Sequence, residues 1–193
     1  MVFRARFSLC LIFAWLAFAD VCSAEEGISM VKLTEWRMNH ISKKNERVKA
    51  ILDVARPSLG VPYKWGGTQM TKGIDCSNFT WQLFRKMGFP YERFIGTQNL
   101  ANWKKGNGLR KIDFDAAEPG DLLVYGYSKG KKWYGHVVVL IDPDGEQSGH
   151  KGLVLGAHGG DVDQVAFITY DGFNEGYYKN PRMKLVNVLR AEK

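Results

Sequence analysis

The strongest constraint on the fold is a change in hydrophobic period along the 193-residue chain. Before residue 90, apolar side chains recur every three or four residues, which predicts amphipathic helices over residues 45–56 and 75–87. After residue 120, they form short β-branched and aliphatic runs bounded by turn residues, which predicts strands. Helices followed by consecutive strands indicate one α+β domain, with N-terminal helices packed on a central antiparallel β-sheet.

Local signals refine these elements. Asp75 can cap the second helix, and Gly88 can end it. The segment Pro143-Asp144-Gly145 predicts a turn between two strands. A short helix is also expected over residues 97–103, and strands are expected over residues 121–125, 136–142, 152–155, 165–170 and 184–190.

The first 24 residues have the composition of a secretory signal peptide. Arg4 and Arg6 precede an apolar run over residues 7–19, and small residues follow at 22–24. The run is shorter than the roughly 18 residues that a membrane-spanning helix needs. We therefore expect cleavage after residue 24, a single mature domain over residues 25–193, and no stable membrane insertion after cleavage.

Cysteine usage identifies a candidate nucleophile. Cys10 and Cys22 lie in the leader, so cleavage leaves Cys76 alone and without a disulfide partner in the chain. Lipid modification of Cys22 is the alternative, although Asp20 and Val21 match the small-residue pattern of lipoproteins poorly. A lone thiol in an exported protein indicates either burial or thiol chemistry. Cys76 falls in the first turn of a predicted helix, where backbone N–H groups lower a thiol pKa.

A thiol nucleophile needs a base, which is most often histidine. His136 opens the apolar run 136–141 directly after Gly135, which places it at the end of a strand. His158 follows another apolar run and is flanked by glycines, so it can orient the first imidazole. One cysteine and two histidines could instead bind zinc, but the closely spaced ligand pairs of such sites are absent from the sequence. We expect neither a metal nor an organic cofactor.

The net charge of the chain limits the classes of partner that it is expected to bind. The formal net charge is +7, of which the leader carries +1 (Arg4 and Arg6 against Asp20), so the mature chain keeps +6. A basic surface suits anionic polymers, membrane headgroups or nucleic acid. No nucleic-acid-binding motif accompanies the charge, so nucleic acid is not an expected partner.

Four segments resemble motifs of the NlpC-type family of bacterial cell-wall cysteine peptidases, which are papain-like enzymes with a permuted fold. Residues 59–67 (LGVPYKWGG) resemble the segment before the nucleophile, and residues 75–79 (DCSNF) resemble the nucleophile motif. Residues 119–122 (PGDL) and 135–137 (GHV) resemble the strand start and the histidine motif that follow. Each motif is short, and the order and spacing of all four make the resemblance specific.

The resemblance implies roles for the matching residues. Cys76 would be the nucleophile, His136 the general base and acid, and His158 the third group that orients the imidazole. The Tyr63 hydroxyl would help the Cys76 backbone N–H to hold the oxyanion. Asp75 and Ser77 would line the pocket for the amino-terminal side of the substrate, although Asp75 could equally be only a helix cap.

The sequence also departs from the family pattern. Asn78 stands where the family usually has glycine, and Gly156 and Ala157 separate His158 from the strand's apolar residues. The segments 136–139 and 101–103 are also similar to the CHAP sister family, which has the same order of cysteine and histidine.

These features predict an exported enzyme, periplasmic or secreted and associated with the cell wall. It would hydrolyse peptidoglycan stem peptides through a thioester, at the bond between D-glutamate and diaminopimelate that the resemblance implies. The alternatives are an amidase or acyltransferase on the same scaffold, and a non-catalytic wall-binding module. We expect a monomer, and the sequence identifies no inhibitor protein.

Overall fold

The fold is described here for residues 30–31, 35–91, 93–103, 105–147, 150–169 and 182–192 of a computed structural model. The predicted signal peptide, residues 1–24, lies outside the described residues. Among the residues described, no helix combines the length and the apolar character needed to cross a membrane.

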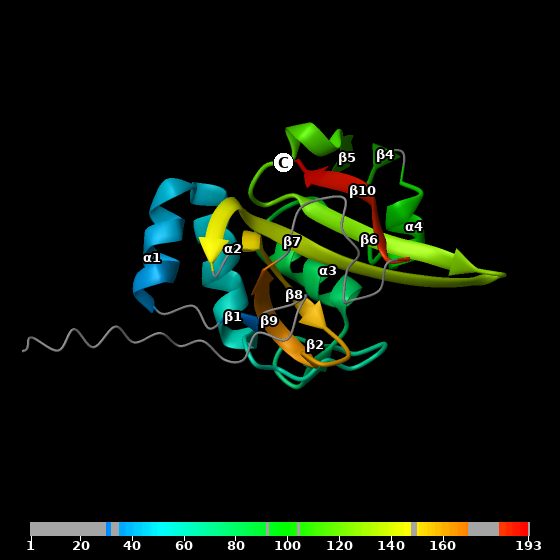
Figure 1. Cartoon of the computed structure of the whole chain (residues 1–193), viewed down its shortest axis with the longest axis horizontal. Helices are drawn as coiled ribbons and strands as arrows, with labels where there is room; N and C mark the ends of the chain where they lie inside the picture. Colours follow the sequence, from blue (N-terminus) through cyan, green and yellow to red (C-terminus); the bar gives the residue numbers. More distant parts are fainter. Residues whose placement is uncertain are drawn as a thin grey trace, which may run out of the picture.

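An eight-stranded antiparallel sheet forms the centre of the molecule (Figure 1). A separate pair of short strands, β2 (Thr68–Gln69) and β3 (Gly73–Ile74), lies in the loop before helix α3 (Cys76–Lys86). The strands of the large sheet lie in the order β1 (Met30–Val31), β9 (Gln164–Thr169), β8 (His150–His158), β7 (Lys132–Gln147), β6 (Leu122–Lys129), β10 (Lys184–Ala191), β5 (Leu109–Ile112) and β4 (Lys105–Gly106).

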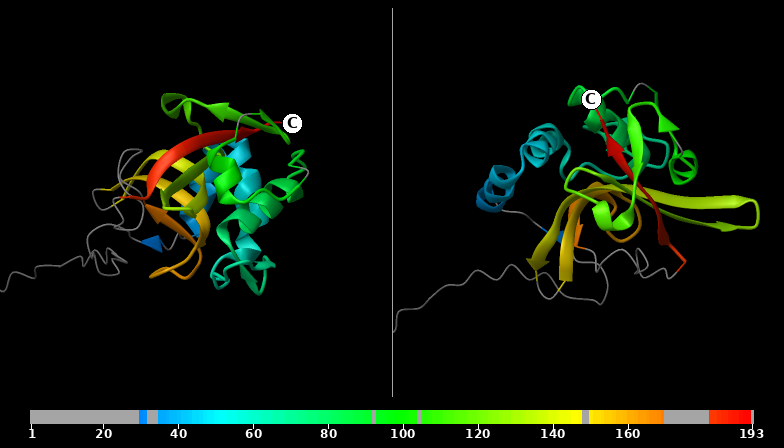
Figure 2. Two further views of the ribbon diagram at one scale, coloured as in Figure 1. Left: turned by 90° about the vertical axis from the view of Figure 1, so that its right-hand side faces the viewer. Right: turned by 90° about the horizontal axis from the view of Figure 1, so that it is seen from above.

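The helices precede the long strands and lie on one side of the sheet (Figure 2). The α+β prediction is therefore confirmed, as are the three helices expected from the sequence. Helix α1 (Glu35–Lys44) was not predicted, because Met38 and Ile41 are the only buried residues among its described side chains. The α-helices are α1 (Glu35–Lys44), which was not predicted, α2 (Glu46–Ala55), α3 (Cys76–Lys86) and α4 (Thr97–Ala101); short 3-10 turns cover Arg56–Ser58 and Phe114–Ala116.

Both faces of the sheet are buried. On β7, Val137 and Val139 point toward the helices and pack in the same cluster as Phe79 of α3. Val138 and Leu140 point to the opposite face, where they join a second apolar cluster. This alternation follows from the two-residue period of a strand, and it fixes which way each neighbouring side chain points.

The β6–β7 hairpin is longer than the sequence predicts. Its ladder runs without interruption from Leu122 opposite Val139 to Lys129 opposite Lys132, through polar residues that carry no alternating apolar pattern. The predicted turn at Pro143 is wrong, because β7 continues to Gln147. The register between β7 and β8 shifts between Asp142 and Glu146, and a proline is tolerated in a strand at such an irregularity.

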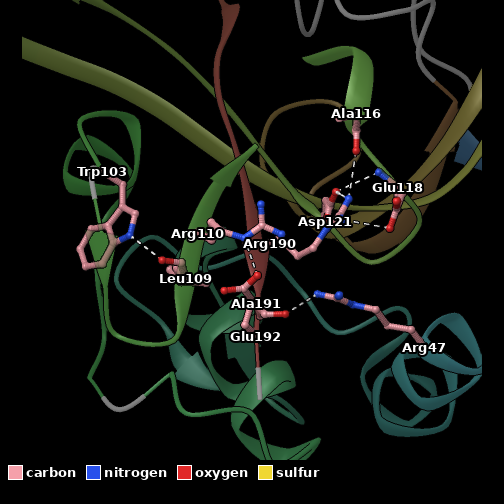
Figure 3. Close-up of polar contacts among 10 residues, drawn as sticks. All are labelled: Arg47, Trp103, Leu109, Arg110, Ala116, Glu118, Asp121, Arg190, Ala191 and Glu192. Carbon is pink, nitrogen blue, oxygen red and sulfur yellow. Dashed lines mark hydrogen bonds and ion pairs between the residues drawn. The ribbon is translucent and has the colours of Figure 1, made fainter. Parts of the chain in front are cut away.

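A buried ion pair joins the start of β6 to β10 (Figure 3). The side chain of Asp121 is fully buried and accepts hydrogen bonds from Arg190 Nε at 2.9 Å and Nη2 at 2.8 Å. It also accepts from the Glu118 backbone N–H at 2.8 Å, while Arg190 contacts the Glu118 carboxylate at 3.0 Å. The Asp121 backbone carbonyl accepts from the Leu140 N–H of β7. Asp121 therefore links the start of β6 to β10 through its side chain and to β7 through its backbone.

We expect Asp121→Ala to lower the free energy of unfolding by about 3–5 kcal/mol, because it leaves the Arg190 guanidinium largely buried without its main partner. Urea denaturation followed by circular dichroism measures this change. Lys49→Ala is the matched control. It removes an ion pair with Asp53 that is about half exposed on both sides, and it should change stability by less than about 1 kcal/mol. Equal losses for both variants would contradict the importance of the buried pair.

Candidate active site

Cys76 is the first residue of α3, and Asp75 is its N-cap. The cap has an extended backbone, and its carboxylate accepts from the Asn78 N–H at 2.7 Å. The helix packs against β7 and β8, so its first turn lies against the centre of the sheet. The Cys76 side chain is buried at 4% exposure, and the backbone N–H of Val137 donates toward its sulfur. The thiol thus lies beside the residue that follows His136.

The thiol is protonated in this environment. Burial raises the pKa of Cys76 to about 12, against the opposing effect of the backbone hydrogen bond from Val137. From the position of Cys76 at the helix N-terminus, the sequence predicts a lowered thiol pKa. The prediction fails because the cost of burying a thiolate exceeds the stabilisation that the backbone N–H groups supply.

His136 and His158 lie next to each other on neighbouring strands. Their ring centroids are 5.3 Å apart, and the ring planes are inclined by 41°. Both side chains are buried, and His158 Nε2 lies 3.1 Å from the carbonyl oxygen of Ala166 on β9. Because a carbonyl oxygen only accepts, Nε2 is the nitrogen that donates.

Gly156 provides the space for this arrangement. A Cβ atom at Gly156 would lie 2.8 Å from Val138 Cγ1 and 3.3 Å from His158 Cε1. A side chain at residue 156 would therefore clash with Val138 and crowd the imidazole of His158. The two residues that separate His158 from the apolar run in the sequence thus include one that makes room for its ring.

Both imidazoles are neutral at ordinary pH. Burial lowers the pKa of His136 well below its usual value, and the neighbouring His158 lowers it further. Burial also lowers the pKa of His158 to about 4, although the hydrogen bond to Ala166 acts in the opposite direction. The free protein therefore holds a protonated thiol and two uncharged imidazoles at this site.

Tyr63 reaches the same place from the loop before α3. Its N–H donates to the Asp163 carbonyl at 2.9 Å, and the N–H of Lys64 donates to the Ile74 carbonyl at 3.1 Å, so the loop is held at both sides. A Cβ at Gly159 would lie 3.1 Å from the Tyr63 ring, so the ring packs on the glycine after His158. Burial, together with nearby Cys76, raises the pKa of Tyr63 above its usual value.

Asp75 and Ser77 are close to the thiol in the chain, and both are occupied by neighbours. Ser77 Oγ donates to Asp75 Oδ1 at 3.0 Å, and Asn78 Nδ2 donates to Asp75 Oδ2 at 3.0 Å. The structure places Asp75 as a helix cap, and both of its oxygens have donors. Asn78 holds the third helical position, so its side-chain amide lies within reach of the Asp75 carboxylate, a contact that the sequence did not predict.

The first turn of α3, with Asp75, Cys76 and Ser77, lies beside the Val137 backbone of β7, and Tyr63 is near Cys76. His136 and His158 lie against each other on β7 and β8. His40 lies on the exposed surface of α1, away from this cluster in the chain. Among the described residues, no group of three or more His, Cys, Asp and Glu side chains is arranged to hold a metal ion.

Comparison with known proteins agrees with this arrangement. Residues 60–185 match the NlpC/P60 family, and the chain belongs to that family. The resemblance inferred from the four sequence motifs is therefore confirmed.

Curated relatives match part of the chain. A Bacillus subtilis protein named gamma-D-glutamyl-L-lysine dipeptidyl-peptidase is 33% identical over 101 residues, which cover 52% of this chain and 31% of the relative. A Listeria innocua protein named probable endopeptidase p60 is 35% identical over 81 residues, 42% of this chain and 16% of the relative. The chain spans about a third or less of the length of these relatives.

A solved structure supports the fold. A Staphylococcus aureus protein of the NLP/P60 family, described as similar to lipoprotein, superposes with a TM-score of 0.52 at 18% identity. The match covers 86% of this chain and 44% of that one. At this identity the likeness bears on the fold alone, and it agrees with an α+β papain-like domain.

Proposed function

We propose that this protein is an exported cysteine peptidase that cleaves the stem peptides of peptidoglycan. This proposal rests on Cys76 at the start of α3 beside β7, and on the adjacent imidazoles of His136 and His158, in a chain of the NlpC/P60 family. The curated relatives named as a gamma-D-glutamyl-L-lysine dipeptidyl-peptidase and as endopeptidases support the substrate class. We further propose that the scissile bond joins D-glutamate to diaminopimelate.

In this mechanism His136 removes the thiol proton as the sulfur attacks the scissile carbonyl carbon. The neutral state of His136 suits it to accept that proton. The imidazolium then gives the proton to the leaving amine, and the C–N bond breaks to leave a thioester on Cys76. Water attacks the thioester, gives one proton to His136, and releases the acid while the thiol recovers its proton.

Tyr63 and the backbone N–H of Cys76 would hold the oxyanion that forms during attack. Because burial raises the pKa of Tyr63, its hydroxyl keeps its hydrogen and can donate it. Donors fixed before the reaction stabilise the transition state without a reorganisation cost. The hydrogen bonds that anchor the loop around Tyr63 supply this fixed position.

His158 would orient the ring of His136. With Nε2 donating to Ala166, neutral His158 offers Nδ1 as an acceptor. Two imidazoles joined by an N–H···N bond of about 2.9 Å have centroids roughly 5 Å apart, which fits the observed 5.3 Å. His136 would then carry its hydrogen on the nitrogen facing His158 and present the other nitrogen to the thiol.

Ser77 and Asp75 would border the amino-terminal side of the substrate. A free substrate amine that pairs with Asp75 must displace the Asn78 amide or share the carboxylate with it. We therefore assign Asp75 a capping role first and a substrate contact second.

Product analysis tests the proposal. Purified protein is incubated with soluble muropeptides that contain diaminopimelate, and the products are separated and weighed by mass spectrometry. We expect fragments that end in D-glutamate and fragments that begin with diaminopimelate. Release of the sugar from the peptide would favour an amidase instead, and transfer to an added amine would favour an acyltransferase. No product from any muropeptide would reject an enzymatic role and favour a wall-binding module.

A further inference from the structure

The tip of the β6–β7 hairpin projects beyond the rest of the molecule (Figures 1 and 2). The ladder stays in register to its last pair, Lys129 opposite Lys132. The strand pairing therefore fixes the direction in which each side chain of the tip points.

One face of the hairpin is fixed to the body of the protein. Trp133 Nε1 donates to Thr97 Oγ1, the first residue of α4, at 3.1 Å. The indole covers Gly126 and Gly135, where a Cβ atom would lie only 2.2 Å and 2.3 Å from it. The hairpin is thus held in one orientation by a ring that two glycines accommodate.

The opposite face carries a row of polar and aromatic side chains that starts at His136. Side chains alternate along β7, so His136, Tyr134 and Lys132 project to the same face. Tyr127 pairs with Tyr134, and their rings stack with centroids 5.1 Å apart and planes inclined by 10°. Lys132 Nζ lies 4.9 Å from the Tyr134 ring centroid. At about 3.4 Å per residue, the row extends roughly 14 Å from His136.

The chemistry of this row fits an anion. Lys129, Lys131 and Lys132 are exposed, and residues 128–135 contain no acidic side chain. Ammonium groups and phenol hydroxyls are hydrogen-bond donors, and a charge-assisted bond to a carboxylate is stronger than a neutral one. Since the Lys132 ammonium rests against Tyr134, it is positioned in the row rather than directed freely into solvent.

We propose that the hairpin arm, formed by Tyr127, Lys129, Lys131, Lys132 and Tyr134, binds carboxylates of the polymeric substrate away from the scissile bond. This inference rests on the proposed function. A γ-linked D-glutamate keeps its α-carboxylate, and diaminopimelate carries a second carboxylate, so stem peptides present repeated anions. An extended peptide of about four residues spans the distance from His136 to Lys132. The arm therefore favours substrates that continue beyond the cleaved bond.

The test compares intact peptidoglycan with a short soluble muropeptide as substrates of the Lys129→Gln/Lys131→Gln/Lys132→Gln variant. We expect the ratio of KM for the polymer to KM for the short peptide to rise about tenfold. This is the affinity expected to be lost when three exposed ion pairs with the polymer are removed. About 0.5 M NaCl should reduce the affinity of the unmodified protein for the polymer by a similar factor. Co-sedimentation with purified peptidoglycan in a Cys76→Ala background measures the same loss without catalysis.

The matched control is Lys43→Gln/Lys44→Gln/Lys111→Gln, which removes three exposed charges from α1 and β5. An equal rise in the KM ratio for this control would overturn the proposal, because net charge alone would then explain the effect. An unchanged ratio in the hairpin variant would also overturn it. The proposal would likewise fail if the hairpin variant bound phosphatidylglycerol vesicles less well but bound peptidoglycan as well as the unmodified protein does. Failure of the proposed function gives a separate result, in which the unmodified protein cleaves neither substrate.

Discussion

Replacing Cys76 with alanine is expected to lower kcat on a soluble muropeptide by about 10⁴-fold or more, because no other group described near β7 can form the thioester. The residue is small and buried, so alanine should preserve the fold and leave substrate binding intact. Product formation followed by mass spectrometry gives kcat and KM, and the urea midpoint verifies folding.

Cys76→Ser provides the companion measurement. Serine keeps the size of the side chain but not the nucleophilicity of a thiol, so it should also lose activity. Iodoacetamide should label the unmodified protein at Cys76 slowly, since burial raises the pKa of the thiol to about 12. Cleavage by Cys76→Ala at the rate of the unmodified protein would exclude a thiol mechanism and leave the family fold without its proposed chemistry.

Replacing His136 with alanine is expected to lower kcat by about 10³- to 10⁴-fold, because the proton of a thiol with a raised pKa must be accepted during attack. KM should change little, since the imidazole acts on the reacting atoms rather than on the rest of the substrate. The measurement is kcat and KM on the same muropeptide, with circular dichroism to establish that the sheet is intact.

Two further histidine variants sharpen the result. His158→Ala should lose less activity than His136→Ala, because it removes orientation of the ring but leaves the base in place. His40→Ala changes an exposed residue of α1 and should retain activity within about twofold, as most exposed substitutions away from a site do. Full activity of His136→Ala would reject the assignment of the base, and a larger loss in His158→Ala would exchange the two roles.

The sequence predicts the elements that bear the candidate site because their local signals agree with their tertiary surroundings. The capping residue Asp75 and the helical spacing of Phe79 and Leu83 define α3, and the apolar run after His136 defines β7. The elements that were missed lack these signals. Helix α1 has few buried residues among its described side chains, and the hairpin beyond Gly126 consists of polar and aromatic residues whose pairing depends on the neighbouring strand.

The ionisation of the site could not be predicted from local sequence. The helix N-terminus favours a thiolate at Cys76, but the pKa follows from how closely α3 packs against β7 and β8. In the same way, glycine is needed at position 156 because the His158 ring, from two residues further along the strand, lies close to it. Contacts of this kind depend on the tertiary structure, and the sequence pattern contains no measure of them.

The depth at which the Cys76 thiol is buried affects how readily it is oxidised. Peroxides and disulfides react with a thiolate, and oxidation of cysteine follows thiolate character and exposure. A thiol that stays protonated until a substrate arrives gives these oxidants little to react with, and within the described residues Cys76 is the only cysteine. The same packing that makes the sulfur dependent on a base for attack therefore protects it between turnovers.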